Sequence, residues 1–186
     1  MVVSFNKPVV CPILIDRVND LATLHALIDQ DRSLWDRELI SEGLKLMELS
    51  ATGSELTEFH VESAIAAAHA TAARTADTDW GKIVSLYNTL MTIRPSPVVA
   101  LNRAIAVAER DGPDRGIEEI RTIPDVDRLA SYPFYWAALG EFELRCKRCE
   151  AARSHFRSAL TLARSEAERH FFTQRLHATE ESAKCT

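Results

Sequence analysis

Two cysteines three positions apart, Cys146 and Cys149, are the clearest candidates for redox or metal chemistry in this sequence. A CxxC pair can act as a dithiol or as half of a zinc site, and Cys149 comes at the expected start of a helix, where the dipole lowers the pKa of a thiol. No second CxxC is present, however, and no βαβ pattern surrounds the pair. We therefore interpret both cysteines as residues of a turn between two helices.

The histidines also lack the spacing of a metal site. His60 and His69 are nine positions apart and His170 and His177 are seven apart, whereas a helical metal pair needs i,i+4 spacing. The sequence has no Gly-rich phosphate loop, no GxSxG motif and no defensible pair of catalytic carboxylates. We expect no catalytic residue, no metal and no cofactor, and thus a protein that is not an enzyme. An uncharacterised all-α enzyme is the last of three functional alternatives.

Asn102 and Arg103 are a polar pair inside the otherwise apolar stretch 97–111. In tetratricopeptide arrays the first helix of each repeat lines a concave groove, where Asn and Arg bind a peptide backbone or carboxylate. In the alternative interpretation, Asn102 is buried and satisfied by the backbone of a neighbouring helix, and Arg103 pairs with an acid such as Glu109 or Asp79. Repeat position predicts that the same groove also includes Phe134, Ala137, Glu141 and Arg145.

Charged residues alternate around a tryptophan near the start of the chain, at Asp31, Arg32, Trp35, Asp36 and Arg37. We interpret them as an ion-pair network that clamps the first helix to the rest of the fold, with a partner-binding patch as the alternative. The same structural interpretation applies to the later group of Asp77, Asp79 and Trp80, in which Asp79 is expected to cap a helix.

The elements that would position these residues are helical hairpins, most clearly over residues 133–164. Trp136 and Phe156 supply bulk there, while Gly140, Ala152 and Ala159 leave room for it. The order of these residues matches the tetratricopeptide pattern, whose period is about 34 residues. The prediction is an all-α fold, a tetratricopeptide-like stack of antiparallel helical hairpins, or α-solenoid.

Capping and breaking residues predict the other helices. Ser33 is expected to cap a helix, with Asp36 completing a capping-box-like start. The apolar stripe of this helix is Leu34, Trp35, Leu39, Ile40, Leu44 and Met47. Further helices are expected over 55–74, 80–93, 97–110 and 114–122, and Ser96 is expected to be the N-cap of the helix over 97–110. The last should begin with a capping box of Ser165 and Glu168 and fade near residue 181. We expect an irregular tail over 1–19, a single domain over 20–182 and a tail over 183–186, with residues 20–28 either a short helix or extended.

Composition narrows the class of protein. The chain has 186 residues, of which 46% are hydrophobic and 26% charged, as expected of a globular domain, and its net charge of -5 disfavours nucleic-acid binding by this chain alone. No apolar run approaches a membrane span, and the N-terminal stretch, broken by Pro8 and Pro12, does not fit a signal peptide. Four cysteines without a disulfide framework favour the cytoplasm.

Four segments resemble one bacterial family when they are taken together: DQDRSLWDRELI, DTDW at 77–80, SPVVALNRAIAVAERDG and YWAALGEFELR. They are similar to the C-terminal tetratricopeptide-like extension of extracytoplasmic-function sigma factors, over about residues 18–180. The resemblance implies a structural role for the signature residues, which are Asp31, Arg32, Trp35, Asp36, Asp79 and Trp80. It also implies an interaction module in transcription initiation that contacts RNA polymerase, the sigma domains or a regulator.

This chain lacks the two promoter-binding domains of that family. We therefore expect a fragment, a truncated paralogue or a regulator that kept only the tail, without direct nucleic-acid binding. An apolar surface left exposed by the missing part would favour a homodimer. The second functional alternative is a stand-alone adaptor unrelated to transcription.

Overall fold

The computed structural model describes residues 13–16, 23–53 and 55–184. Within these ranges the chain is predominantly helical, which confirms the predicted class. The helices are α1 (Arg37–Ser50), α2 (Glu58–Thr71), α3 (Trp80–Ile93), α4 (Pro97–Asp111), α5 (Pro113–Arg121), α6 (Pro133–Arg145), α7 (Cys149–Thr161) and α8 (Glu166–Lys184). Short 3₁₀ turns lie at Leu27–Asp29, Arg32–Leu34, Thr75–Asp77 and Val126–Leu129. None of the described helices is long and apolar enough to cross a membrane.

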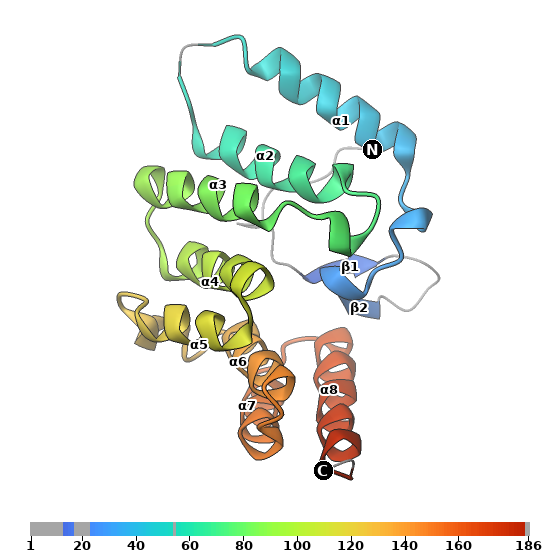
Figure 1. Ribbon diagram of the computed structural model, residues 1–186, viewed down its shortest axis with the longest axis vertical. Coiled ribbons are helices and arrows are strands. Elements are labelled where there is room, and N and C mark those ends of the chain that lie inside the picture. The colour runs from blue at the N-terminus through green and yellow to red at the C-terminus, as the bar shows by residue number, and fades with distance from the viewer. Residues whose placement is uncertain (1–12, 17–22, 54, 185–186) are drawn as a thin grey trace.

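Each helix packs on the next one along the chain, from α1 to α8, so the helices follow an arc (Figure 1). A hairpin of two short strands, β1 (Ile13–Asp16) and β2 (Thr23–Ala26), lies beside α8. The strands are antiparallel, with Ile13 opposite Ala26 and Asp16 opposite Thr23. The prediction of an irregular segment over residues 1–19 is therefore wrong for β1, and residues 23–26 are extended. This antiparallel pairing joins residues of two different segments, and helical periodicity carries no information about such pairing.

Local capping residues set most helix starts. Ser96 accepts a hydrogen bond from the backbone N–H of Val99 at 3.2 Å, with Pro97 in the first helical position, as predicted. The start of α1 differs from the prediction, because Asp36 rather than Ser33 caps it, accepting from the backbone N–H groups of Glu38 and Leu39 at 2.9 and 3.0 Å. A carboxylate accepts two N–H groups better than a hydroxyl, and it lies directly before the longer helix.

The cap of α8 is nearly the predicted box. Ser165 Oγ accepts from the backbone N–H of Glu168 at 3.1 Å, as expected. The Glu168 carboxylate reaches back to the N–H of Arg164 at 2.7 Å, one residue before the N–H used in a standard box. The helix then continues to Lys184, beyond the predicted end near 181.

The α6–α7 hairpin packs as the sequence predicts. A Cβ atom on Gly140 would lie 2.9 Å from the Phe156 ring, and Phe156 itself is 1% exposed. Ala152 and Ala159 are fully buried on the same face of α7. Trp136, in contrast, is only partly buried; it stacks on His155 and donates its indole N–H to the carbonyl of Ala130 at 2.9 Å. The close approach of α6 and α7 therefore depends on Gly140.

Helix α1 does not bury the stripe predicted for it. None of its residues is buried, and Leu39, Leu46 and Leu49 are each at least 60% exposed. Ile40, Leu44 and Met47 are partly buried on the side that packs on α2. Little of the stripe is covered because α1 lies at one end of the arc, where α2 is the described helix on which it packs (Figure 1).

Candidate binding groove

A pocket of about 100 Å³ lies between the segment 26–28 and helices α4, α6 and α8. Most of its lining is apolar, with aromatic rings from Phe134 and Phe171. Its charged and amide side chains are Asn102, Glu109, Glu141 and Arg175. An apolar hollow with a few polar groups is the usual form of a binding site. We call this hollow the groove.

Helical periodicity explains how α4 and α6 build the groove. Asn102, Ile105 and Glu109 recur at three- and four-residue spacing on α4, so their side chains share one face. Phe134, Ala138 and Glu141 recur in the same way on α6. The predicted groove residues Asn102, Phe134, Ala137 and Glu141 therefore come together.

Asn102 is the least satisfied polar group of the groove. The residue is 5% exposed, and its Nδ2 atom is buried with no hydrogen-bond partner among the described residues. The alternative prediction was that the backbone of a neighbouring helix satisfies the Asn102 side chain, but Nδ2 has no such partner among the described residues. A buried donor without an acceptor costs about 1–3 kcal/mol, and an acceptor supplied by a ligand would remove that cost.

Acidic and basic side chains alternate along the rim of the groove. Arg175 of α8 pairs with Asp29 at 2.5 Å and approaches Glu141 at 3.6 Å, and its guanidinium lies over the Phe171 ring. Burial raises the pKa of the Glu141 carboxyl above its ordinary value, and Arg175 opposes that shift. A carboxylate from a ligand would thus find its natural partner in Arg175.

Arg145, another predicted groove residue, lies outside the lining of this pocket. It forms an ion pair with Glu109, which does line the pocket. The Arg145 charge is therefore already paired, and Arg145 affects the groove through its ion pair with Glu109.

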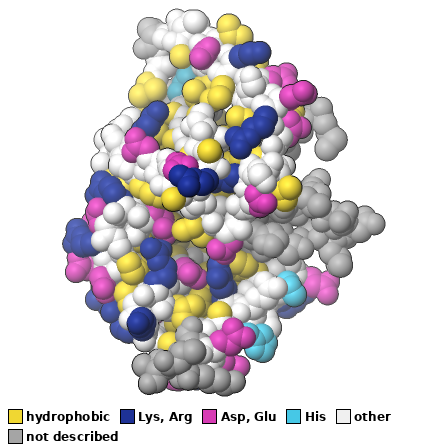
Figure 2. Space-filling model, turned by 45° about the vertical axis from the view of Figure 1, so that its right-hand side comes forward, with side chains coloured by type: hydrophobic (Ala, Val, Ile, Leu, Met, Phe, Trp, Pro, Cys, Tyr) yellow, Lys and Arg dark blue, Asp and Glu magenta, His cyan; other side chains and the backbone are white. Residues whose placement is uncertain are grey.

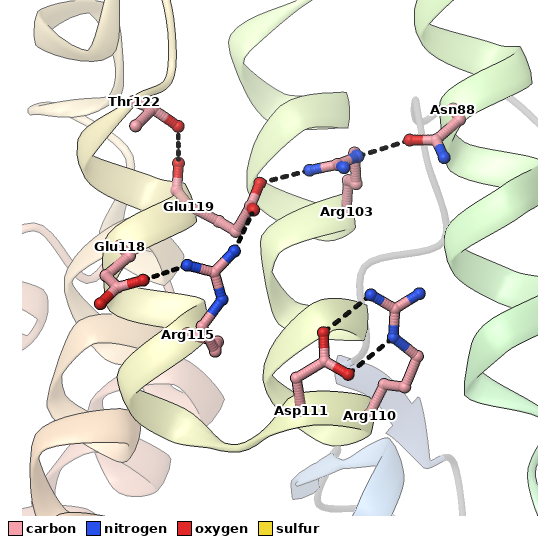
Figure 3. Close-up of polar contacts among 8 residues, drawn as sticks. All are labelled: Asn88, Arg103, Arg110, Asp111, Arg115, Glu118, Glu119 and Thr122. Carbon is pink, nitrogen blue, oxygen red and sulfur yellow. Dashed lines mark hydrogen bonds and ion pairs between the residues drawn. The ribbon is translucent and has the colours of Figure 1, made fainter.

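Arg103 also lies outside the groove, between α3, α4 and α5. Its Nε donates to Asn88 Oδ1 at 2.6 Å, and its Nη1 pairs with Glu119, which Arg115 also approaches (Figure 3). The alternative of an acid-paired Arg103 is thus confirmed, although the acid is Glu119 rather than Glu109 or Asp79. One step along a helix turns the side chain by about 100°, so neighbours such as Asn102 and Arg103 face different sides.

The tryptophan-centred charge cluster clamps the chain, and within the described part of the structure it does so through hydrogen bonds to backbone carbonyls rather than through ion pairs. Arg32 is 3% exposed, and its Nη1 donates to the carbonyls of His69 and Ala72 at 3.0 and 3.1 Å, while its guanidinium lies over the Trp35 ring. These carbonyls lie at the C-terminal end of α2, where a cation is favourable. Arg32 therefore fastens the segment before α1 to the end of α2.

The other signature residues have similarly local roles. Asp31 accepts from the backbone N–H of Ser33 at 2.9 Å, and Asp79 caps α3 by accepting from that of Lys82 at 2.9 Å, as expected. Trp80 packs edge-on against His69 and also reaches the groove lining. Burial, assisted by Arg32, lowers the pKa of His69 to about 4.

The CxxC pair lies at the predicted turn. Cys146 ends α6, Cys149 begins α7, both thiols are free, and Lys147 between them has a positive φ of 60°. Burial raises the pKa of the Cys146 thiol, which makes it a weaker nucleophile at neutral pH. Among the described residues, no group of three His, Cys, Asp or Glu side chains is arranged to hold a metal ion.

Most of the groove lining was not predicted from the sequence, including Leu27 and Arg175. Leu27 belongs to the segment 20–28, whose structure was left open between helix and extended chain. Arg175 follows Phe171 by four positions, so an arginine on the apolar face of the last helix was a usable signal.

The chain is similar to a segment of a longer protein. It is 37% identical over 150 residues to uncharacterised protein R00370 of Rhizobium meliloti (strain 1021). The match covers 81% of this chain and 35% of the relative, so the chain spans about one third of that protein's length. No family model matches, and no solved structure matches.

Proposed function

We propose that this chain is a bacterial, cytoplasmic protein-interaction module of a sigma-factor-like transcription regulator, and that its groove binds a segment of a partner protein. The single observation that carries the proposal is the buried, unpartnered Nδ2 of Asn102 in an apolar groove. An amide in such a position suits the backbone carbonyl of a bound peptide.

A tetratricopeptide-like stack is part of the proposal. Two features support it: successive helices pack pairwise along an arc, and Gly140 lets α6 approach Phe156 of α7. In such a stack, α4 and α6 would be the first helices of two consecutive repeats, and their groove-lining faces would lie on the concave side of the array.

The distribution of charge on the surface bears on which class of partner the chain can bind. On the face shown in Figure 2, basic and acidic side chains are interleaved rather than segregated, so that face offers no basic patch for a phosphate backbone. The resemblance of four sequence segments to sigma-factor extensions supports RNA polymerase, the sigma domains or a regulator as the partner. The module itself would carry no catalytic activity.

A capture experiment with matched variants tests the proposal. Tagged wild-type chain is incubated with core RNA polymerase and, separately, with isolated sigma domains. We expect Asn102→Ala to reduce capture at least tenfold, because it removes the groove's unpartnered donor. We expect Arg103→Ala to keep wild-type capture, because the neighbouring Arg103 lies outside the groove.

Thermal unfolding completes the test. Asn102→Ala removes a buried donor that lacks an acceptor, which is stabilising, and leaves a small cavity, which is destabilising; because the two effects oppose each other, we expect no loss of more than about 1 kcal/mol in the free energy of unfolding. Equal losses of capture in the two variants, or a large loss of stability in Asn102→Ala, would contradict the groove. Failure of the wild-type chain to capture polymerase or sigma domains would contradict the role in transcription.

A further inference from the structure

One wall of the groove is a segment from the N-terminal part of the chain, residues 26–28. Ala26 packs against the cluster that contains Phe171 and Phe172, and Leu27 is 3% exposed and lines the pocket beside Asn102. The Asp29 carboxylate meets Arg175 of α8 at 2.5 Å, although the two residues are 146 positions apart in sequence. We call residues 26–29 the internal segment.

The internal segment is held in the way that a peptide ligand is held. Its leucine supplies buried apolar surface beside the pocket, and its aspartate supplies a charge for Arg175 of the groove. Outside the groove, its backbone carbonyl at Ile28 accepts a hydrogen bond from Thr75 Oγ1 at 3.3 Å. An apolar side chain followed two positions later by a carboxylate is therefore the pattern that the groove recognises within its own chain.

The internal segment leaves part of the groove unfilled. The pocket of about 100 Å³ lies alongside Leu27, and the Nδ2 of Asn102 has no acceptor among the described residues. A cavity of about 150 Å³ accepts a benzene molecule, so this space suits part of a ring. A segment with a larger apolar side chain, and with a carbonyl placed for Asn102, would satisfy groups that the internal segment leaves unsatisfied.

We propose that the internal segment is an intramolecular competitor, and that the partner is a peptide segment with an aromatic residue two positions before an aspartate or glutamate. This inference rests on the proposed function of the groove. Because the competitor belongs to the same chain, it binds without the entropy loss of association, and a partner must exceed it in intrinsic affinity. The competitor therefore excludes weak ligands and admits those that fill the pocket.

Fluorescence anisotropy with the full chain tests the proposal. The probes are a labelled peptide of residues 23–30, TLHALIDQ, and the same peptide carrying Leu27→Phe. We expect the Leu27→Phe peptide to bind at least tenfold more tightly than its parent. We also expect Asp29→Asn in the chain to raise the affinity for both peptides about five- to tenfold, because it weakens the competitor.

Asp77→Asn is the matched control. Asp77 is an exposed aspartate that pairs with Arg74 outside the groove, so this variant should bind both peptides as the wild type does. A charge exchange supplies the second arm: Arg175→Glu should lose the Asp-containing peptides and bind a peptide carrying Asp29→Lys. Circular dichroism reports whether each variant is folded. If Arg175→Glu is unfolded, the comparison of Asp29→Asn with Asp77→Asn decides alone.

Two results would overturn the inference: equal peptide affinities in the Asp29→Asn and Asp77→Asn chains, or no binding of either peptide to any folded chain. Capture of polymerase that depends on Asn102, together with failure of the peptides, would refute the recognition pattern and leave the proposed function standing. Peptide binding without capture of polymerase or sigma domains would support the pattern and refute the role in transcription.

Discussion

Gly140 offers the sharpest test of how α6 and α7 pack. A Cβ atom at this position would lie 2.9 Å from two atoms of the Phe156 ring and 3.0 Å from a third. Phe156 is 1% exposed, and the free space beside it is the small pocket that it helps to line. Gly140→Ala must therefore shift the ring off its rotamer or separate the two helices.

The size of the effect follows from two opposing contributions. Replacing a helical glycine by alanine gains about 1 kcal/mol of helix propensity. Overpacking a filled core costs about 1–3 kcal/mol, and the measured value includes both. We expect a net loss of about 1 kcal/mol or more in the free energy of unfolding, which lowers Tm by about 2–4 °C in a chain of this size.

Gly43 provides the matched control, because it lies inside α1 and a Cβ there would meet nothing within 4 Å. Gly43→Ala should therefore raise stability by up to about 1 kcal/mol. Chemical denaturation of both variants isolates the packing cost as their difference, about 2 kcal/mol or more. In a double-mutant cycle, Phe156→Leu should relieve most of the penalty of Gly140→Ala. If Gly140→Ala were as stabilising as Gly43→Ala, the tight contact between α6 and α7 would be refuted.

Two further predictions concern the end of α2. Because the pKa of His69 is about 4 in the folded protein, the unfolded chain binds the extra proton, and stability that is complete above pH 6.5 falls as the pH drops toward 4. Urea denaturation should show a loss of about 2 kcal/mol between pH 7 and pH 5, and His69→Gln should remove that part of the slope; identical slopes would contradict a buried neutral imidazole. Arg32→Ala should cost about 2–3 kcal/mol, because it removes charge-assisted bonds to two helix-end carbonyls. Hydrogen exchange should then rise at the end of α2, and unchanged protection there would contradict the clamp.

The sequence predicted features that are decided within a turn or two of helix. Ser96, Asp79 and Ser165 could be assigned as caps because a capping side chain bonds a backbone N–H only two or three residues away. The fit of Gly140 to Phe156 was also readable, since a hairpin with a short turn leaves few ways for two helices to pack. Asp36 was missed as a cap because a serine three positions earlier carried a similar local signal.

Solvent exposure was predicted less well. The apolar stripe of α1 was correctly recognised as helical, but Leu39 is 64% exposed, because burial depends on whether another element covers the face. Periodicity shows which side chains share a face and does not show what packs against it.

Part of the groove could be predicted from the sequence, and the rest depended on the tertiary structure. The sequence predicted one groove for Asn102, Phe134, Glu141 and Arg145, and the first three line one pocket in the structure while Arg145 does not. Helical geometry already places Asn102 and Arg103 on different sides of α4, but the sequence could not decide which of the two faces the groove. That choice depends on where α3 and α5 lie around α4.

Only the tertiary structure placed residues 26–29 against α8 and brought Asp29 to Arg175. It also gave Arg32 helix-end carbonyls as partners where carboxylates were expected. Such contacts join groups many residues apart, and their formation depends on how the whole chain closes upon itself. Local sequence thus determined the helices of this protein and how two of them fit, and the folded chain decided which distant groups meet in its groove.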